Sequence, residues 1–158
     1  MQLPLYNAIL AKCKRDAGKF FVVKIKKRSD CPISCSLDVW GDKWSLIIVR
    51  DLMLSGPRTY GDFLKSEEKI ATNILASRLQ MLKENDVIVR FVRPEIKTKA
   101  LYKLTQKGID LLPLMIEINL WADKYFTISA ERKAVLKQVE KGKDVFIKTQ
   151  MSELRKIM

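Results

Sequence analysis

Apolar and polar positions separate with the period of a helix over residues 70–84. At about 100° per residue, one half of such a helix is apolar and carries Ile70, Ile74, Leu75, Leu79, Met81 and Leu82. The other half is small and polar toward its N-terminal end, and it carries Thr72, Asn73, Ala76, Ser77, Gln80, Lys83 and Glu84. The pattern predicts a helix over about 71–85 with one buried side and one side open to a partner.

Two helices are predicted from the start and stop signals between Cys31 and this stretch. A short helix over residues 34–40 would end at Gly41, and Asp42 would cap the next helix, residues 43–55. This second helix is apolar almost all round, so we expect it to be the central buried helix.

A turn at 56–59 would lead to a third helix, residues 60–66, with Thr59 as its cap. This short helix, a turn and the helix over 71–85 form the pattern of a helix-turn-helix. In such motifs the second helix enters the DNA major groove by its N-terminal residues.

The apolar period then changes from that of a helix to that of a strand. Residues 87–94 alternate and stop at a proline, residues 100–104 can form the return strand, and the connection over 94–99 carries Lys97 and Lys99. A helix-turn-helix followed by a basic hairpin is typical of a winged helix. The predicted class is mainly α with a small antiparallel β-hairpin, an α+β winged helix-turn-helix with extra terminal helices.

The remainder of the chain is predicted to be helical. Thr105 can cap the next helix, and Pro113 either kinks or restarts it. Residues 109–126 carry more apolar side chains than one buried face needs, which favours burial against a second copy of the chain. The tail over 130–158 reads as two charged helices divided near Gly142, with an inner face of Val135, Leu136, Val139, Phe146, Ile147, Met151 and Leu154.

The 158 residues are enough for one domain with a real core. We divide them into a poorly defined basic N-terminal extension (1–30), with strand-like character over Phe20 to Ile25, a winged-helix domain (31–126) and a helical tail (127–158). No long apolar run or secretory signal is visible, so we expect a cytoplasmic protein without a membrane segment.

The net charge of +12 favours a nucleic-acid partner. Half of it lies in residues 1–30, which carry eight basic and two acidic side chains, and a basic N-terminus alone is often only a solvated tail. The rest of the chain keeps the other half of the surplus.

Histidine is absent, and there are three cysteines. The absence of histidine removes His-based triads, Cys-His dyads and mixed zinc sites, and three thiols are too few for an all-thiolate zinc site. We therefore expect no catalytic residues, no metal and no cofactor. The odd number of cysteines indicates reduced thiols and not a disulfide scaffold.

The stretch from CPISCSLDVWGDKWSLIIVRDLMLSGPRTYGDFL through IATNILASRLQMLKENDVI, the hairpin, YKLTQKG and LLPLMIEINLWADKY resembles the HxlR-type winged-helix transcriptional regulators, relatives of the MarR group. The resemblance runs from about Cys31 to Phe126. It implies a homodimer on operator DNA, paired through the first and penultimate helices, with some members sensing electrophiles or oxidants through a cysteine at the position of Cys31. The interface residues it implies here are Trp40, Leu114, Ile118, Trp121 and Tyr125.

Candidate DNA contacts follow from these patterns. Thr72, Asn73, Ser77 and Gln80 are assigned to base edges and nearby phosphates, because Asn and Gln can read adenine bidentately; the alternative is a merely solvated helix face. The start of the third helix, Arg58, Thr59 and Tyr60, suits a phosphate or is a plain helix cap. Arg93, Lys97 and Lys99 of the wing are assigned to phosphates or the minor groove.

Arg78 falls within the apolar arc. We expect it to pack its stem there and pair with an acid such as Asp62 or Glu67, although a phosphate contact is also open.

Cys31 is the candidate thiol sensor, with Lys27 and Arg28 nearby to favour the thiolate. The alternative is a buried small hydrophobe, since reactivity requires exposure and a lowered pKa. Cys35 and Cys13 are weaker candidates. A small molecule in a groove between the winged core and the helix over 111–126 is a second way to regulate the protein.

The sequence therefore predicts a dimeric, sequence-specific DNA-binding regulator on a pseudo-palindromic operator, with half-sites about one helical turn apart. Two other functions remain open. One is a winged helix used only for protein contacts, and the other is a thiol enzyme built on Cys31, which would lack an internal histidine as base.

Overall fold

The computed structural model describes residues 29–92 and 99–157. The chain forms two compact units, Met1–Gly41 and Asp42–Met158, which are described separately. In the first unit the described part is the helix α2 (Pro32–Trp40), which has a proline in its first turn and ends at Gly41 as predicted. The strand-like segment Phe20 to Ile25 lies outside the described residues.

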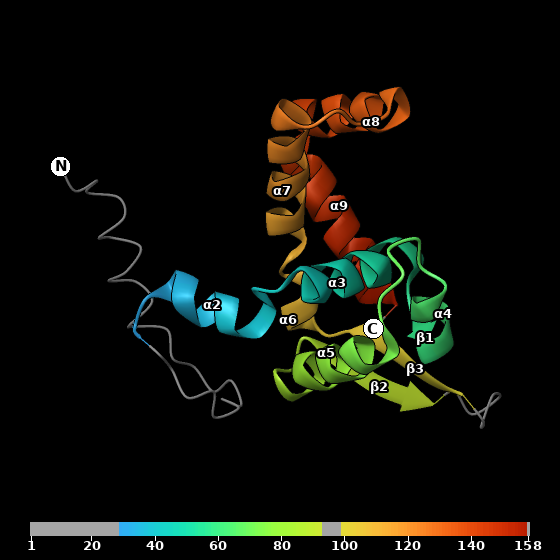
Figure 1. The fold of residues 1–158 in the computed structure, drawn as a ribbon. Coiled ribbons are helices and arrows are strands. Elements are labelled where there is room, and N and C mark those ends of the chain that lie inside the picture. Colours follow the sequence, from blue (N-terminus) through green and yellow to red (C-terminus); the bar gives the residue numbers. More distant parts are fainter. Residues whose placement is uncertain (1–28, 93–98, 158) are drawn as a thin grey trace. The chain divides into compact units, whose positions relative to one another are not determined.

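The second unit is mainly helical with one small sheet (Figure 1). The sheet is antiparallel with strand order β1-β3-β2, so the predicted mainly helical class is confirmed. Its elements are α3 (Lys43–Ser55), β1 (Arg58–Thr59), α4 (Tyr60–Leu64), α5 (Thr72–Glu84), β2 (Ile88–Val92), β3 (Ala100–Leu104), α6 (Gln106–Ile109), α7 (Leu112–Tyr125), α8 (Ala130–Lys141) and α9 (Lys143–Lys156).

Helix α3 is the centre of the core, as its apolar sequence predicts. Asp42 caps it by accepting hydrogen bonds from the backbone N–H groups of Trp44 and Ser45 at 3.0 and 3.1 Å. Its residues Ile48, Val49 and Leu52 are buried. Helix α5 and the strand β3 contact α3, and α4 in turn contacts α5 and β3, so α3 supports the second helix of the helix-turn-helix and the hairpin.

The helix-turn-helix consists of α4, a turn and α5. Helix α4 ends two residues earlier than the predicted Ser66, and the turn passes through Lys69 with a positive φ of 49°. Phe63 of α4 and Leu75, Leu79 and Leu82 of α5 are buried, which fixes how α5 is rotated about its axis.

The hairpin pairs β2 with β3, from Ile88 opposite Leu104 to Val92 opposite Ala100. The predicted turn at 56–59 is wrong in its second half, because Arg58 and Thr59 form the short strand β1 opposite Tyr102 and Leu101. A two-residue strand has too few positions to show a period, and its partner is distant in sequence. The chain enters it through Gly56, whose φ of 69° favours glycine.

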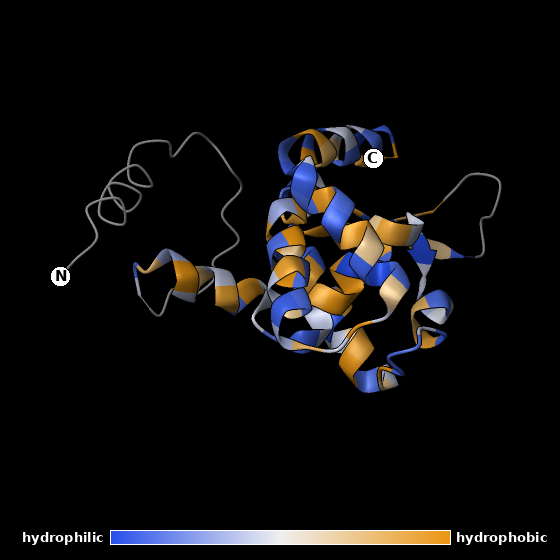
Figure 2. Ribbon diagram, turned by 90° about the horizontal axis from the view of Figure 1, so that it is seen from above, coloured by the Kyte–Doolittle hydropathy of each residue, from blue (hydrophilic) through white to orange (hydrophobic). Residues whose placement is uncertain are grey.

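The C-terminal helices form a second core with α7. Thr105 caps α6 by accepting a hydrogen bond from the N–H of Gly108, and Pro113 stands in the first turn of α7, so it restarts the helix and does not kink it. Figure 2 shows hydrophobic and hydrophilic residues alternating along the helices of the chain. The second core comprises Leu112, Ile116 and Val139, surrounded by Met53, Leu120, Phe146, Ile147, Met151 and Leu154.

The predicted inner face of the tail is largely confirmed by this second core. Two predicted residues are not part of this core: Val135 is 57% exposed, and Leu136 is only partly buried. Among the described residues, no helix is both long enough and apolar enough to cross a bilayer.

Candidate nucleic-acid interface

The polar flank of α5 is open to solvent. We use this name for Thr72, Asn73, Ala76, Ser77 and Gln80, all of which are exposed, while the opposite side of the helix is buried. Helix α5 and the sheet lie at one end of the second unit and α8 lies at the other (Figure 1). The C-terminal helices therefore leave this flank uncovered.

The first turn of α5 is held from α4. Its cap residue, Ala71, makes no side-chain hydrogen bond, and the hydroxyl of Tyr60 donates a hydrogen bond of 2.8 Å to the carbonyl oxygen of Thr72. An uncapped helix start leaves backbone N–H groups that can meet a phosphate. Tyr60 thus links the start of α4 to the N-terminal end of α5, where the polar flank begins.

Thr59 and Asp62 form a capping box at the start of α4. The Thr59 hydroxyl donates to Asp62 Oδ2 at 2.7 Å and accepts from the Asp62 N–H at 3.2 Å. The Asp62 carboxylate also accepts the Thr59 N–H at 2.9 Å. Hydrogen bonds from the hydroxyl and then the backbone of Thr59 lower the pKa of Asp62. Thr59 is therefore a helix cap, and its polar groups are already engaged.

Arg58 is engaged with its own protein in the same way. Its guanidinium donates to Ser55 Oγ at 2.7 Å and to the carbonyl oxygen of Asp62 at 3.3 Å. These hydrogen bonds hold the guanidinium of Arg58 against the segment that connects α3 to α4. The predicted phosphate contact of Arg58, Thr59 and Tyr60 stays a prediction.

Replacing Thr59 by alanine should lower the free energy of unfolding by about 1 kcal/mol, because the capping box is lost. Since the pKa of Asp62 is lowered in the folded chain, this stabilisation is present above the ordinary carboxyl pKa and is lost as the pH falls through the lowered value. Urea denaturation at neutral and acid pH measures both effects. Thr59→Ser keeps the hydroxyl and is the control; equal stability of the two variants at neutral pH would contradict the role of the cap.

A basic concavity lies between α4 and the wing. Its lining includes Lys65 from the end of α4, Arg90 from β2 and Lys99 at the start of the return strand, together with Tyr60 and Tyr102. Lys65, Arg90 and Lys99 are all exposed. Arg93 and Lys97 lie outside the described residues.

Lys65 and Arg90 are basic residues of this surface that the sequence reasoning did not select. Arg90 shares a sheet face with Ile88, because alternate residues of a strand face the same way. A charged residue in an otherwise apolar strand was the available signal. Lys65 gave no signal of its own, because its place beside the wing depends on the tertiary fold.

Arg78 pairs with a different acid from those predicted. Its Nε atom lies 3.0 Å from Asp42 Oδ1, an ion pair at a distance that suits a hydrogen bond but with an N–H direction that does not. The predicted pairing with an acid is therefore found, but neither of the two examples, Asp62 and Glu67, is the partner, and Asp62 is engaged by Thr59. Arg78 thus ties α5 to the capped start of α3.

Helix α7 presents an apolar stripe on its outer side. Leu114, Ile118, Trp121 and Tyr125 follow one another at spacings of four, three and four residues, which places them on one side of the helix. Trp121 is 56% exposed and Tyr125 is 68% exposed, with their ring centroids 5.0 Å apart. Trp40, the other predicted interface residue, ends α2 in the first unit.

The two described cysteines lie at the start of α2, and both are free thiols. Cys31 is exposed, so the alternative of a buried small hydrophobe does not hold for it. Cys35 is partly buried, and its thiol donates to the carbonyl oxygen of Ser29 at 3.3 Å. Cys13 lies outside the described residues. Over residues 29–92 and 99–157, no three His, Cys, Asp or Glu side chains converge in a way that could hold a metal ion.

The helix-turn-helix, the uncovered flank of α5 and the basic hairpin agree with a family model described as HxlR-like helix-turn-helix, which matches residues 39–130. The chain belongs to the HxlR-like helix-turn-helix family. The match begins within α2 and ends where α8 begins, so most of α8 and all of α9 lie beyond it.

Several relatives of this HxlR-like chain are known. It is 32% identical over 96 residues to the HTH-type transcriptional regulator YodB of Bacillus subtilis, covering 60% of this chain and 85% of YodB. The crystal structure of PA1607 is similar at 42% identity with a TM-score of 0.58, covering 66% of this chain and 71% of that one. The structure of the redox regulator HypR in its oxidised form is similar at 26% identity with a TM-score of 0.56. The similarity covers 62% of this chain and 100% of the HypR chain. YodB and HypR are named as regulators and not as enzymes.

Proposed function

We propose that this chain is a homodimeric, sequence-specific DNA-binding regulator of transcription without catalytic activity, acting in the cytoplasm. Membership of a helix-turn-helix family supports the DNA-binding part. The observation that carries the proposal is the polar flank of α5, which the rest of the second unit leaves open.

The flank supplies the base contacts in this proposal. Asn73 and Gln80 have side-chain amides that can read adenine, and Thr72 and Ser77 have hydroxyls for base edges or phosphates. Gln80 also donates to Glu84 one turn further on, so reading a base with its NH₂ group requires it to leave that partner. Asn73 is therefore the better candidate for direct readout.

The basic concavity supplies the backbone contacts. Lys65, Arg90 and Lys99 surround it, and we add Arg93 and Lys97 of the wing from the sequence. Such contacts hold the protein in register on the duplex and carry no sequence information of their own. We assign Tyr60 a positioning role through its bond to Thr72, and Arg58 and Thr59 a supporting one.

The second copy is proposed to bind the apolar stripe of α7. Three of the four stripe residues are at least 38% exposed, an arrangement typical of a surface that is covered in an assembly. Twofold symmetry would present two α5 helices to successive major grooves of a pseudo-palindromic operator, with half-sites about one helical turn apart.

Regulation through Cys31 is compatible with its exposure. HypR is named a redox regulator, and Cys31 lies at the exposed start of α2. Reaction with a peroxide or a quinone at a rate no faster than free cysteine would argue against both a sensor and a thiol enzyme at this residue.

Replacing Asn73 by alanine should change which DNA sequences are preferred more than it changes non-specific affinity. The lost amide discriminates between bases by about 1 to 3 kcal/mol, whereas phosphate contacts remain. Selection of bound genomic fragments by the wild type and by the variant measures this preference, and competition with unrelated DNA measures the non-specific part. An unchanged selected sequence would remove Asn73 from the readout.

Salt dependence separates this function from a winged helix that contacts only proteins. Each phosphate contact that is lost should reduce the slope of log K against log salt by about one. The double substitution Lys97→Ala and Lys99→Ala should weaken binding to all DNA sequences alike. A flat salt dependence of the wild type would favour the protein-contact alternative.

A further inference from the structure

The two C-terminal helices lie almost wholly outside the family match, which ends at residue 130. They are nevertheless part of the compact second unit. Helix α9 contacts α6, α7 and α8, and Figure 1 shows it running from the α8 end of this unit back toward α3 and the sheet. This placement raises the question of what α9 adds to a winged helix.

The first half of α9 packs on the inner side of α7. Phe146, Ile147 and Met151 surround the buried residues Leu112 and Ile116 of α7. Lys143 pairs with Glu117 of α7 at 2.7 Å. Helix α7 is thus held on one side by α9 and carries the exposed stripe on its other side.

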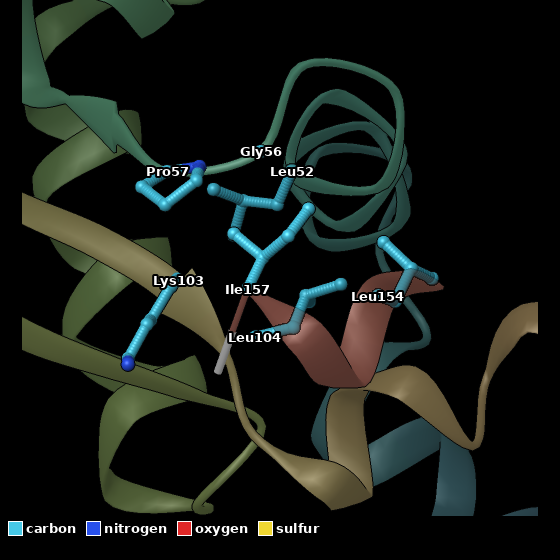
Figure 3. A pocket seen from close by; sticks show the side chains of 7 residues that line it. All are labelled: Leu52, Gly56, Pro57, Lys103, Leu104, Leu154 and Ile157. Carbon is cyan, nitrogen blue, oxygen red and sulfur yellow. The ribbon is translucent and has the colours of Figure 1, made fainter. Parts of the chain in front are cut away.

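The C-terminal end of α9 and its cap residue, Ile157, reach the end of β3 at the base of the hairpin. Leu154 and Ile157 line a small apolar pocket with Leu52 of α3, Pro57, and Leu104 at the end of β3 (Figure 3). Its free volume is only about 10 Å³, so the side chains fill it. Arg155 adds a hydrogen bond of 3.0 Å from Nε to Gln106 Oε1 in α6.

Helix α9 packs on the core of α7 and lines a pocket with Leu104 at the end of β3, and Leu154 takes part in both contacts. Helix α9 is a single 14-residue segment, so a tilt of α7 at one end must move Leu154 and Ile157 or break their packing. Leu154 and Ile157 line one pocket with Leu104, the last residue of the hairpin strand β3. Leu154 also packs, like Met53 of α3, against the core of Leu112, Ile116 and Val139.

We propose that α9 is a strut that fixes the wing relative to α7, with Leu154 and Ile157 as positioning residues for DNA binding. The proposal rests on the proposed function for the roles of α7 and the wing. In the proposed dimer, α7 pairs with its copy in the other subunit, so fixing each wing relative to its own α7 also fixes the distance between the two wings.

The test compares the double variant Leu154→Ala with Ile157→Ala against the control Val145→Ala. Val145 is on the same helix and is 71% exposed, so its truncation leaves both ends of the strut in place. Hydrogen exchange of the DNA-free protein is followed over residues 100–109, 112–125 and 150–157. DNA affinity is measured for a selected genomic fragment, and sedimentation measures the oligomeric state.

In the double variant we expect exchange over 100–109 to become about 10-fold faster, because β3 and α6 lose their support. We expect DNA affinity to fall about 5- to 10-fold while the oligomeric state stays that of the wild type. The control should match the wild type in every measurement.

Faster exchange over 150–157 with unchanged exchange over 100–109 would overturn the strut. If the double variant does not fold, Ile157→Ala alone decides in the same way with a smaller change, since Ile157 is 47% exposed and its truncation is mild. A wild type that binds no DNA would refute the proposed function, whereas the exchange measurements without DNA would still decide whether the strut exists.

Discussion

Replacing Ser77 by glutamate should reduce DNA affinity at least about 100-fold, since like charges brought together at an interface cost several kcal/mol. Ser77 is exposed at the middle of the polar flank, where a duplex in the proposed position would bring phosphates and base edges. The added carboxylate meets no buried group in the free protein. The folded chain should therefore be as stable as the wild type in thermal unfolding.

Ser152→Glu is the matched control for this variant. It makes the same change on an exposed residue of α9, a helix that contacts α6, α7 and α8. Ser152→Glu should bind DNA nearly as well as the wild type, because it has the same change in net charge as Ser77→Glu but leaves the polar flank unaltered. If the two glutamate variants bind equally well, the polar flank of α5 does not face DNA.

Replacing Trp121 by alanine should weaken dimerisation by about 2 to 4 kcal/mol, which is about 30- to 1000-fold in the dimer dissociation constant. Trp121 is the largest side chain of the α7 stripe, it is 56% exposed, and its ring contacts those of Tyr125 and Phe126. A large aromatic anchor of this kind commonly dominates an interface. Sedimentation over a range of concentrations measures the shift toward monomer.

Val145→Ala is the control for the interface as well, because Val145 is an exposed apolar residue on α9 outside the stripe. It should leave the dissociation constant unchanged. A Trp121→Ala protein that sediments as the same dimer would place the interface elsewhere. DNA binding should weaken along with dimerisation, since one subunit reaches only one half-site.

Local signals predicted the helices well. Asp42, Thr59 and Thr105 were read as caps because a short polar side chain before an apolar run favours a helix start, and each of them makes that hydrogen bond. The inward side of α5 followed from its period of 3.6 residues. The same period identified the polar flank, because a side that the core does not need is visible in the sequence.

Features that depend on distant parts of the chain were missed or wrongly assigned. Strand β1 exists only because β3 lies beside it, and the acid that meets Arg78 is set by how α5 packs on α3. The basic concavity is a similar case, because Lys65 and Arg90 come together only in the folded unit.

The C-terminal tail combines a feature that local sequence predicts with one that depends on distant parts of the chain. Its inner face was predicted from periodicity, but what this face covers was not. The structure puts Leu154 and Ile157 against Leu52 and Leu104, so α9 belongs to the winged core. Helical periodicity shows that a face is buried and does not identify its partner.

Methylation interference on a genomic fragment selected by the wild-type protein tests the role of the polar flank most directly, because the guanine N7 atom lies in the major groove. We expect interference at two clusters of guanines about one helical turn apart, with the cluster pattern altered in Asn73→Ala. Interference confined to a single cluster, or none despite tight binding, would contradict the placement of two α5 helices in successive major grooves.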